Sequence, residues 1–292
     1  MEQLLQSGDD TDLPPISLDL RGNCLPERFS ARLASADVFP VTEALRNDVR
    51  ITSVDLGYNK IDASGAAAVG RVLSQNGTLL NINLEFNDIG ADGGKSIAEA
   101  LPSCTSLRQL VLRGNDMGDE AGVAVAADVN ASPLELLDIS SCDLGIKSII
   151  KIAQSAESAD CKLSHLYLSN ARTRENEDQK GIVLGRMIKL NTSLVCLDIS
   201  RMKLSDDDAE HIVRNLKVNT TLKSISLAAN KLSWVAGTHF AKYLAENAAL
   251  EELDLSGNEL HDNGAGTARK ENTAPLFLPC LLSPFFFLSL HF

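Results

Sequence analysis

Six cysteines and five histidines are the residues of this 292-residue chain that could act as nucleophiles or metal ligands. The cysteines include no C-x-x-C pair, and no histidine is spaced to complete a zinc site with them. The histidines share no motif, so we interpret each as an isolated surface or edge residue. We therefore expect reduced thiols, no catalytic residue, no metal and no cofactor. The residues concerned are Cys24, Cys104, Cys142, Cys161, Cys196, Cys280, His165, His211, His239, His261 and His291.

Three consecutive acidic residues, Asp206–Asp208, could in principle bind a cation. They stand where a helix is expected to begin, and the helix dipole stabilises acidic side chains in a first turn. We favour that interpretation. The sequence also has no phosphate-binding P-loop, no H-E-x-x-H helix and no G-x-S-x-G elbow, which argues against an enzyme.

One sequence pattern, L-x-x-L-x-L-x-x-N-x-L, recurs nine times and predicts the strands and helices that carry these residues. The step is about 28 residues, within the range of leucine-rich repeats. Clean copies include 51–61, 79–89 and 250–260, and the copy at 163–173 is irregular. The ninth position falls at Asn23, Asn59, Asn87, Asn115, Cys142, Ala171, Met202, Asn230 and Asn258.

Each copy predicts a short strand followed by a helix. The two apolar residues of L-x-L face inward, as the alternation of a strand requires. A helical spacing follows, for example Ile61, Gly65, Val69 and Leu73, or Leu232, Ala236, Phe240 and Leu244. The predicted fold is an α/β solenoid: a curved horseshoe with parallel strands on the concave face and helices on the convex face.

Several asparagines and glycines have predicted structural roles. The asparagines of the ninth position should satisfy backbone groups in the turn that leaves each strand, with Cys142 in the same slot. Asn76, Asn191, Asn219 and Asn247 should end helices in the left-handed conformation rather than carry glycans. A glycine just inside the helix, at Gly65, Gly93 and Gly264, should let the helix lie close to the strands.

Three segments are predicted. Residues 1–14 form a polar, disordered N-terminus without a signal peptide, 15–266 form the repeat domain of about nine repeats, and 267–292 form an apolar tail outside the repeat. Three prolines (Pro275, Pro279, Pro284) make the tail a poor membrane anchor, so no membrane partner is expected. The polar run from Arg172 to Lys180 in the sixth copy predicts a loop, which is either a partner site or a degenerate repeat.

The candidate functional surface is the concave face. Its central position reads Asp19, Asp55, Asn83, Val111, Asp138, Tyr167, Asp198, Ser226 and Asp254 along the nine copies. The formal charge of −12 disfavours a nucleic-acid partner and favours a protein with a basic segment; no small-molecule substrate is expected. The alternative is that L-D-L is common in such repeats and aids solubility. The predicted partner-binding residues are Asp19, Asp55, Glu85, Asp138, Tyr167, Asp198, Glu252 and Asp254.

The 28-residue spacing with N-x-L and then G-x-x-x-[VIF]-x-x-x-L resembles the ribonuclease-inhibitor-like class of leucine-rich repeats. That resemblance implies an interaction protein, with two alternatives: a GTPase-activating protein like the Ran activator, or an enzyme inhibitor like ribonuclease inhibitor. The first expects a long acidic C-terminal run and the second many more cysteines, and this chain has neither.

A closer resemblance covers about residues 18–265 and includes the unusual run SSCDLG before the irregular sixth copy. It is to a family of intracellular leucine-rich-repeat proteins of proliferating or stem-like cells without known enzymatic chemistry. It implies a location in the cytoplasm and nucleus, including the nucleolus.

Overall fold

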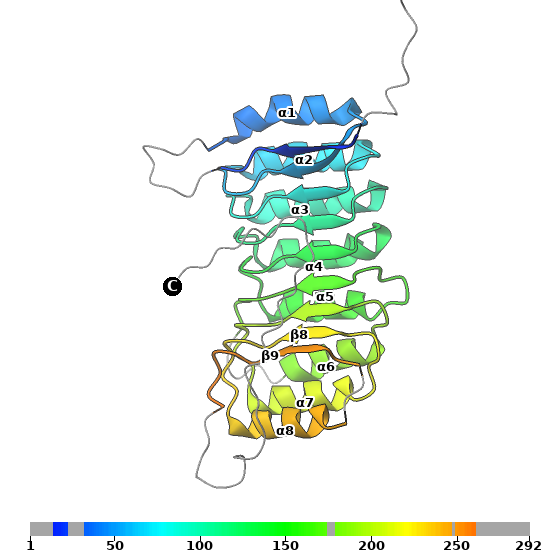
Figure 1. Cartoon of the computed structure of the whole chain (residues 1–292). Coiled ribbons are helices and arrows are strands. Elements are labelled where there is room, and N and C mark those ends of the chain that lie inside the picture. Colours follow the sequence, from blue (N-terminus) through cyan, green and yellow to red (C-terminus); the bar gives the residue numbers. More distant parts are fainter. Residues whose placement is uncertain (1–13, 23–31, 174–178, 247–248, 261–292) are drawn as a thin grey trace, which may run out of the picture.

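The computed structural model describes residues 14–22, 32–173, 179–246 and 249–260, and the structural statements below concern these residues. Nine strands form one parallel sheet in chain order, so each strand pairs with its neighbours in the sequence (Figure 1). We call the repeat that contains strand βn copy n. The strands are β1 Ile16–Asp19, β2 Ile51–Asp55, β3 Asn81–Asn83, β4 Gln109–Val111, β5 Leu136–Asp138, β6 His165–Tyr167, β7 Cys196–Asp198, β8 Ser224–Ser226 and β9 Glu252–Asp254.

Helices follow the strands and form a second layer on one side of the sheet (Figure 1). Packed helices lie about 8–10 Å apart and paired strands about 4.8 Å apart, so each copy is a wedge with its strand on the inner side. This confirms the predicted α/β leucine-rich-repeat solenoid. The helices are α1 Ser35–Asn47, α2 Ala63–Gln75, α3 Gly90–Ala100, α4 Gly118–Asp128, α5 Ile146–Ala156, α6 Lys180–Leu190, α7 Asp206–Leu216 and α8 Trp234–Leu244, with short 3-10 turns η3 Leu101–Ser103 and η4 Val129–Ala131.

The core lies between the two layers. Within β4 and the residue after it, Leu110 and Leu112 are fully buried while Val111 between them faces the other way and is partly exposed. The same alternation holds in the neighbouring copies, because the strands pair without a shift along the repeat: Leu110 lies beside Ile82 and Leu137. Burial of two apolar residues in nearly every copy makes the core continuous from end to end.

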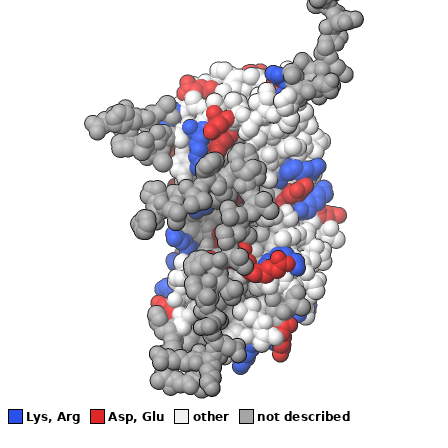
Figure 2. Space-filling model, viewed as in Figure 1, with Lys and Arg blue, Asp and Glu red and all other residues white. Residues whose placement is uncertain are grey.

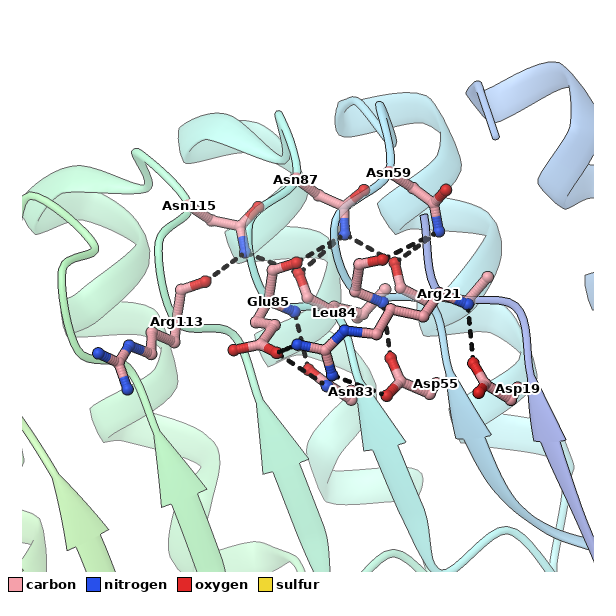
Figure 3. A network of polar contacts seen from close by, with 12 residues as sticks. Asp19, Arg21, Asp55, Asn59, Asn83, Leu84, Glu85, Asn87, Arg113 and Asn115 are labelled. Carbon is pink, nitrogen blue, oxygen red and sulfur yellow. Dashed lines mark hydrogen bonds and ion pairs between the residues drawn. The ribbon is translucent and has the colours of Figure 1, made fainter. Parts of the chain in front are cut away.

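The asparagines of the ninth position satisfy backbone groups of the turn, as predicted, and they also form a ladder across copies (Figure 3). Asn87 is typical: its amide donates to the carbonyls of Leu56 and Leu84, at 2.9 and 3.0 Å, and its oxygen accepts from Ile61 N at 3.0 Å. Two of these partners belong to the preceding copy, so each asparagine joins two copies. Buried backbone groups that leave a strand are thereby satisfied.

Cys142 occupies the same slot in copy 5, which confirms its assignment as a turn residue. Its single S–H is shared between Leu112 O and Ser140 O, which lie 3.1 and 3.4 Å from the sulfur. Burial raises the pKa of this thiol to about 12, so it stays protonated and unreactive at neutral pH.

The helix-ending asparagines correct one prediction. Asn76 has φ −84° and Asn191 φ −74°, so neither is left-handed. Instead, the Asn76 amide donates to Leu45 O of the preceding helix at 2.6 Å, and its oxygen accepts from Thr78 N and Leu79 N. Asn191 makes the same set of bonds to Ala156 O and Leu194 N. A side chain that caps two copies at once removes the need for a left-handed turn.

Two details of the helices also follow from the repeat. A Cβ on Gly65 would lie 2.6 Å from Ser35 Oγ on α1, and a Cβ on Gly93 would lie 2.9 Å from Ala66 Cβ on α2. These glycines therefore let each helix pack against the preceding helix, rather than against the strands as predicted. Leu244, predicted as a core residue, is 39% exposed, and Tyr243 is buried instead. At about 100° per residue, Tyr243 returns to within about 20° of the direction of the buried Ala236, whereas Leu244 is about 80° away.

The N-cap of α2 provides a test of stability against pH. Asp62 accepts hydrogen bonds from Ser64 N and Gly65 N, and its Oδ1 lies 2.6 Å from Ser35 Oγ on α1. The Ser35 and Ser64 hydroxyls and the backbone N–H groups lower the pKa of Asp62 from 3.8 to about 2. Asp62→Ala should therefore cost about 1 kcal/mol at pH 7.

This contribution should depend on pH in one direction. Because the folded-state pKa lies below the unfolded value, the stabilisation is complete above pH 3.8 and declines as the pH falls toward 2. Urea unfolding of both proteins from pH 7 downward measures it. A difference between them that stays constant below pH 3.8 would contradict the assigned hydrogen bonds.

Residues 1–13 of the proposed segment 1–14, the proposed segment 267–292, Gly264 and Asn247 lie outside the described residues.

Candidate functional site

The strand face, meaning the side of the sheet opposite the helices, carries six of the eight predicted site residues in one row across the strands, with Glu85 and Glu252 beside it. Strand pairing places Asp19 beside Asp55, Asp55 beside Asn83, and so on through every copy. At the far end Asp198 lies beside Ser226, and Ser226 beside Asp254. Neighbouring members are separated by one strand spacing, about 4.8 Å.

The row has a structural role that sequence reasoning missed. In seven copies the side chain accepts a hydrogen bond from the backbone N–H two residues later, an Asx-type turn that starts the loop after the strand. Short side chains with an acceptor oxygen, such as Asp, Asn and Ser, can do this, which explains why they dominate the position. The distances are 2.8–3.0 Å for the Asp and Asn members and 3.4 Å for Ser226, and the acceptors are Asp19, Asp55, Asn83, Asp138, Asp198, Ser226 and Asp254.

Members of the row differ in burial. Asp19 is exposed and Asp198 and Asp254 are partly exposed, whereas Asp55 and Asp138 are each only 7% exposed. Burial raises the pKa of Asp138, against the opposing effect of the Ser140 N–H. The buried carboxylates therefore act through their field, and direct contacts with a partner fall to the more exposed members.

Arg21 neutralises the N-terminal part of the row (Figure 3). Its guanidinium lies 3.3 Å from Asp55 Oδ2 and 2.5 Å from Glu85 Oε1, and it stacks on the Tyr58 ring at 4.6 Å from the centroid. Burial opposes the charge on Arg21, but Glu85 and Asp55 hold its pKa above the ordinary value. The structure thus brings together Asp55 and Glu85, two predicted site residues 30 positions apart.

The strand face is therefore not uniformly acidic. Acidic and basic side chains lie next to one another near its N-terminal end (Figure 2). At the other end, Glu252 and Asp254 accept hydrogen bonds from Ser224 and Ser226, at 2.7 and 3.1 Å. Tyr167 lies between Asp138 and Asp198 in the row, with its hydroxyl 3.9 Å from Cys196 Sγ.

A second feature missed by sequence reasoning is the residue just before the ninth position. Its backbone is left-handed, with φ of 50–73°, in copies 2 to 9. The sequence contained a signal for this conformation, because Gly114 and Gly257 occupy the position and glycine favours a left-handed backbone. The non-glycine members are Tyr58, Phe86, Ser141, Asn170, Arg201 and Ala229.

The irregular sixth copy has Ala171 in the place of the ladder asparagine, and two of its side chains bond to backbone carbonyls of copy 7. The Thr173 hydroxyl donates to Met202 O at 2.5 Å. Lys180 is fully buried and donates to Lys203 O at 2.6 Å, with Asp208 Oδ2 at 3.9 Å. Asp206–Asp208 begin α7 as predicted, with Asp208 in a capping box with Ser205. Residues 174–178 of the predicted loop are outside the described range.

The described residues include neither a cluster of metal ligands nor a helix that could span a membrane. No three His, Cys, Asp or Glu side chains converge there to hold a metal ion. Within the same ranges, no helix has the length and apolar character needed to cross a bilayer. His165 on β6 has a pKa below its ordinary value because it is half-buried.

The comparison with protein families agrees with the repeat. The family profile described as Leucine Rich repeat matches residues 51–70, 75–98, 103–126 and 246–267. No curated protein matches the chain significantly. Among solved structures, the chain is similar to the crystal structure of a Bacteroides fragilis protein, with 13% identity, a TM-score of 0.41, and coverage of 75% of this chain and 70% of that chain.

Proposed function

We propose that this chain, which is a leucine-rich-repeat protein, is a non-catalytic scaffold whose strand face binds a basic segment of another protein. Leucine-rich-repeat domains generally act in protein–protein interaction. The observation that carries the proposal is the row on the strand face in which five of nine copies have an aspartate, with Asp138, Asp198 and Asp254 on alternate strands. Such an array attracts a chain of positive charges and aligns it across the strands.

The C-terminal half of the row is the favoured docking region. Arg21 already offsets the charges of Asp55 and Glu85 in copies 1 to 3. Asp138, Asp198 and Asp254 have no Lys or Arg within ion-pair distance in the described part of the chain. A basic segment would therefore meet less competition there.

The combined substitution Asp138→Asn, Asp198→Asn and Asp254→Asn tests this proposal. Asparagine keeps the oxygen that accepts the turn hydrogen bond, as Asn83 does in copy 3, so only charge is removed. Fluorescence anisotropy at low salt measures the binding of labelled nonalysine or nonaarginine. The affinity of the triple variant for these peptides should be lower by about 1–2 kcal/mol, or about 5- to 30-fold. The salt dependence of binding should also become shallower.

A matched control separates the strand face from total charge. Glu43, Glu99 and Glu210 lie exposed on α1, α3 and α7, and their substitution by glutamine removes the same three charges from the helical layer. Equal weakening by both triple variants would show that only net charge matters, and the proposal would fail. Nonaglutamate should not bind either protein.

The finer identity of the chain is also a proposal. Its sequence resembles leucine-rich repeat-containing protein 34 over about residues 18–265, which supports a factor of proliferating or stem-like cells in the cytoplasm, nucleus and nucleolus. On this proposal the direct partner is a protein rather than a nucleic acid, a membrane or a small-molecule substrate. Imaging of the tagged full chain against a nucleolar marker tests the location.

A further inference from the structure

A row of charged residues runs along the loop edge of the solenoid, directly after the positions of the asparagine ladder (Figure 3). Each member stands between two residues that face the core, as Asp88 does between the buried Asn87 and Ile89, so its side chain is directed out of the turn. All members are exposed except Asp143, which is partly exposed. We call this set the rim row; in copies 2 to 9 it reads Lys60, Asp88, Asp116, Asp143, Arg172, Lys203, Lys231 and Glu259.

Backbone hydrogen bonds hold the rim row in register from copy to copy. The Asp88 N–H donates to Ile61 O of copy 2 at 2.9 Å, and the Arg172 N–H donates to Leu144 O of copy 5 at 2.7 Å. Successive members therefore follow one another at about the strand spacing of 4.8 Å. The same bond to the preceding copy is made by Lys60, Lys231 and Glu259.

The charges of the rim row change sign at its midpoint. Copies 3 to 5 carry three aspartates, whereas copies 6 to 8 carry one arginine and two lysines. The two end members are reversed again, with Lys60 in copy 2 and Glu259 in copy 9. When the row is read from its two ends toward the middle, every position therefore has a counterpart of opposite charge: copy 2 matches copy 9, copy 3 matches copy 8, copy 4 matches copy 7, and copy 5 matches copy 6.

We propose that the rim row is the interface of an antiparallel homodimer, with a two-fold axis between copies 5 and 6. Rotation about an axis that runs from the strand layer to the helix layer lays loop edge on loop edge and reverses the order of the copies. A two-fold interface needs a surface that complements itself, and the rim row has that property. The residues that face each other across the interface are Lys60 and Glu259, Asp88 and Lys231, Asp116 and Lys203, and Asp143 and Arg172, and each pair forms twice.

The charges of the rim row are available for these contacts. Asp88, Asp116 and Lys203 form no ion pair with another described residue. Next to the axis, Arg172 and Asp143 pair within the chain at 3.2 Å, with 67% and 39% of their side chains still exposed. In the dimer these two pairs meet as a cluster of four alternating charges. The strand faces of the two copies stay open, so the dimer leaves the proposed docking surface accessible.

Sedimentation velocity of the full chain tests this interface. Exposed ion pairs are individually weak and are screened by salt, so we expect a dimer at about tens of micromolar in low salt that dissociates as salt is raised. Asp116→Lys and Lys203→Asp each place two pairs of like charges across the interface, so each should weaken self-association about 10-fold or more. Both residues are exposed, so the fold should be retained, as a thermal melt will show.

A mixture of these two variants provides the decisive measurement. In their heterodimer the two new charges face each other with opposite sign, and the unchanged Asp116 and Lys203 also face each other, so association should return to the wild-type level. A mixture of Asp88→Lys with Lys203→Asp is the matched control, because it contains the same charges displaced by one copy. It should remain monomeric, since the new charges then face residues of their own sign.

Three results would overturn the proposal: a wild-type chain that stays monomeric in low salt, association that does not respond to salt, or equal recovery in both mixtures. The variant with Asp138, Asp198 and Asp254 replaced by asparagine keeps the rim row and should dimerise like the wild type. The dimer and the basic-segment docking site can therefore fail independently of each other.

Discussion

Replacing Leu112 by alanine is expected to destabilise the fold by about 2–5 kcal/mol. Leu112 is fully buried, and the equivalent positions of the adjacent copies, Leu84 and Ile139, are buried beside it. In a stacked array a void at one copy is lined by residues of the next, whose positions are set by their own strands. The cavity can therefore collapse only in part, and the lost contacts add to the lost transfer free energy.

Denaturant unfolding of the purified chain measures this effect. Val111→Ala is the control, since Val111 is one residue away on the same strand but faces outward and is partly exposed. Val111→Ala should lower the free energy of unfolding by less than about 1 kcal/mol. If the two variants unfold at the same denaturant concentration, the inward and outward faces of the strand have been assigned wrongly.

Asn115→Ala should cost about 2–4 kcal/mol, because it breaks the asparagine ladder in the middle of the array. The fully buried amide donates to Leu84 O and Leu112 O, at 2.9 and 2.7 Å, and its oxygen accepts from Ile89 N at 3.3 Å. Alanine would leave these three backbone groups buried without their partner, and water could not reach them without opening two copies.

The chain itself supplies the control for this substitution. Cysteine fills the same slot in copy 5, where its single S–H is shared between two carbonyls, so Asn115→Cys should cost less than Asn115→Ala. Asn258→Ala, at a partly exposed rung of copy 9, should also cost less. Similar losses for all three variants in denaturant unfolding would mean that the ladder bonds contribute little.

Much of the fold was predictable because the repeat is a local pattern. The spacing of apolar residues identifies strand, turn and helix within about 28 residues, and repetition then requires a stack of parallel strands. The inward faces, the turn asparagines and the role of Cys142 followed from this register. The last turn of α8 did not, because four-residue spacing departs from the helical period by about 40° per step.

Whether each residue of the candidate site is exposed, buried or paired with a charge depends on contacts between copies, which no single repeat encodes. Arg21 reaches Glu85, 64 residues away, and so offsets part of the predicted acidic charge, while Lys180 and Thr173 join copy 6 to backbone carbonyls of copy 7. The sequence alone determined which residues face the strand side, since that depends on alternation within a strand. Only the tertiary structure decided which of them are buried, paired or stacked, because those properties arise where side chains of different copies meet across the stack.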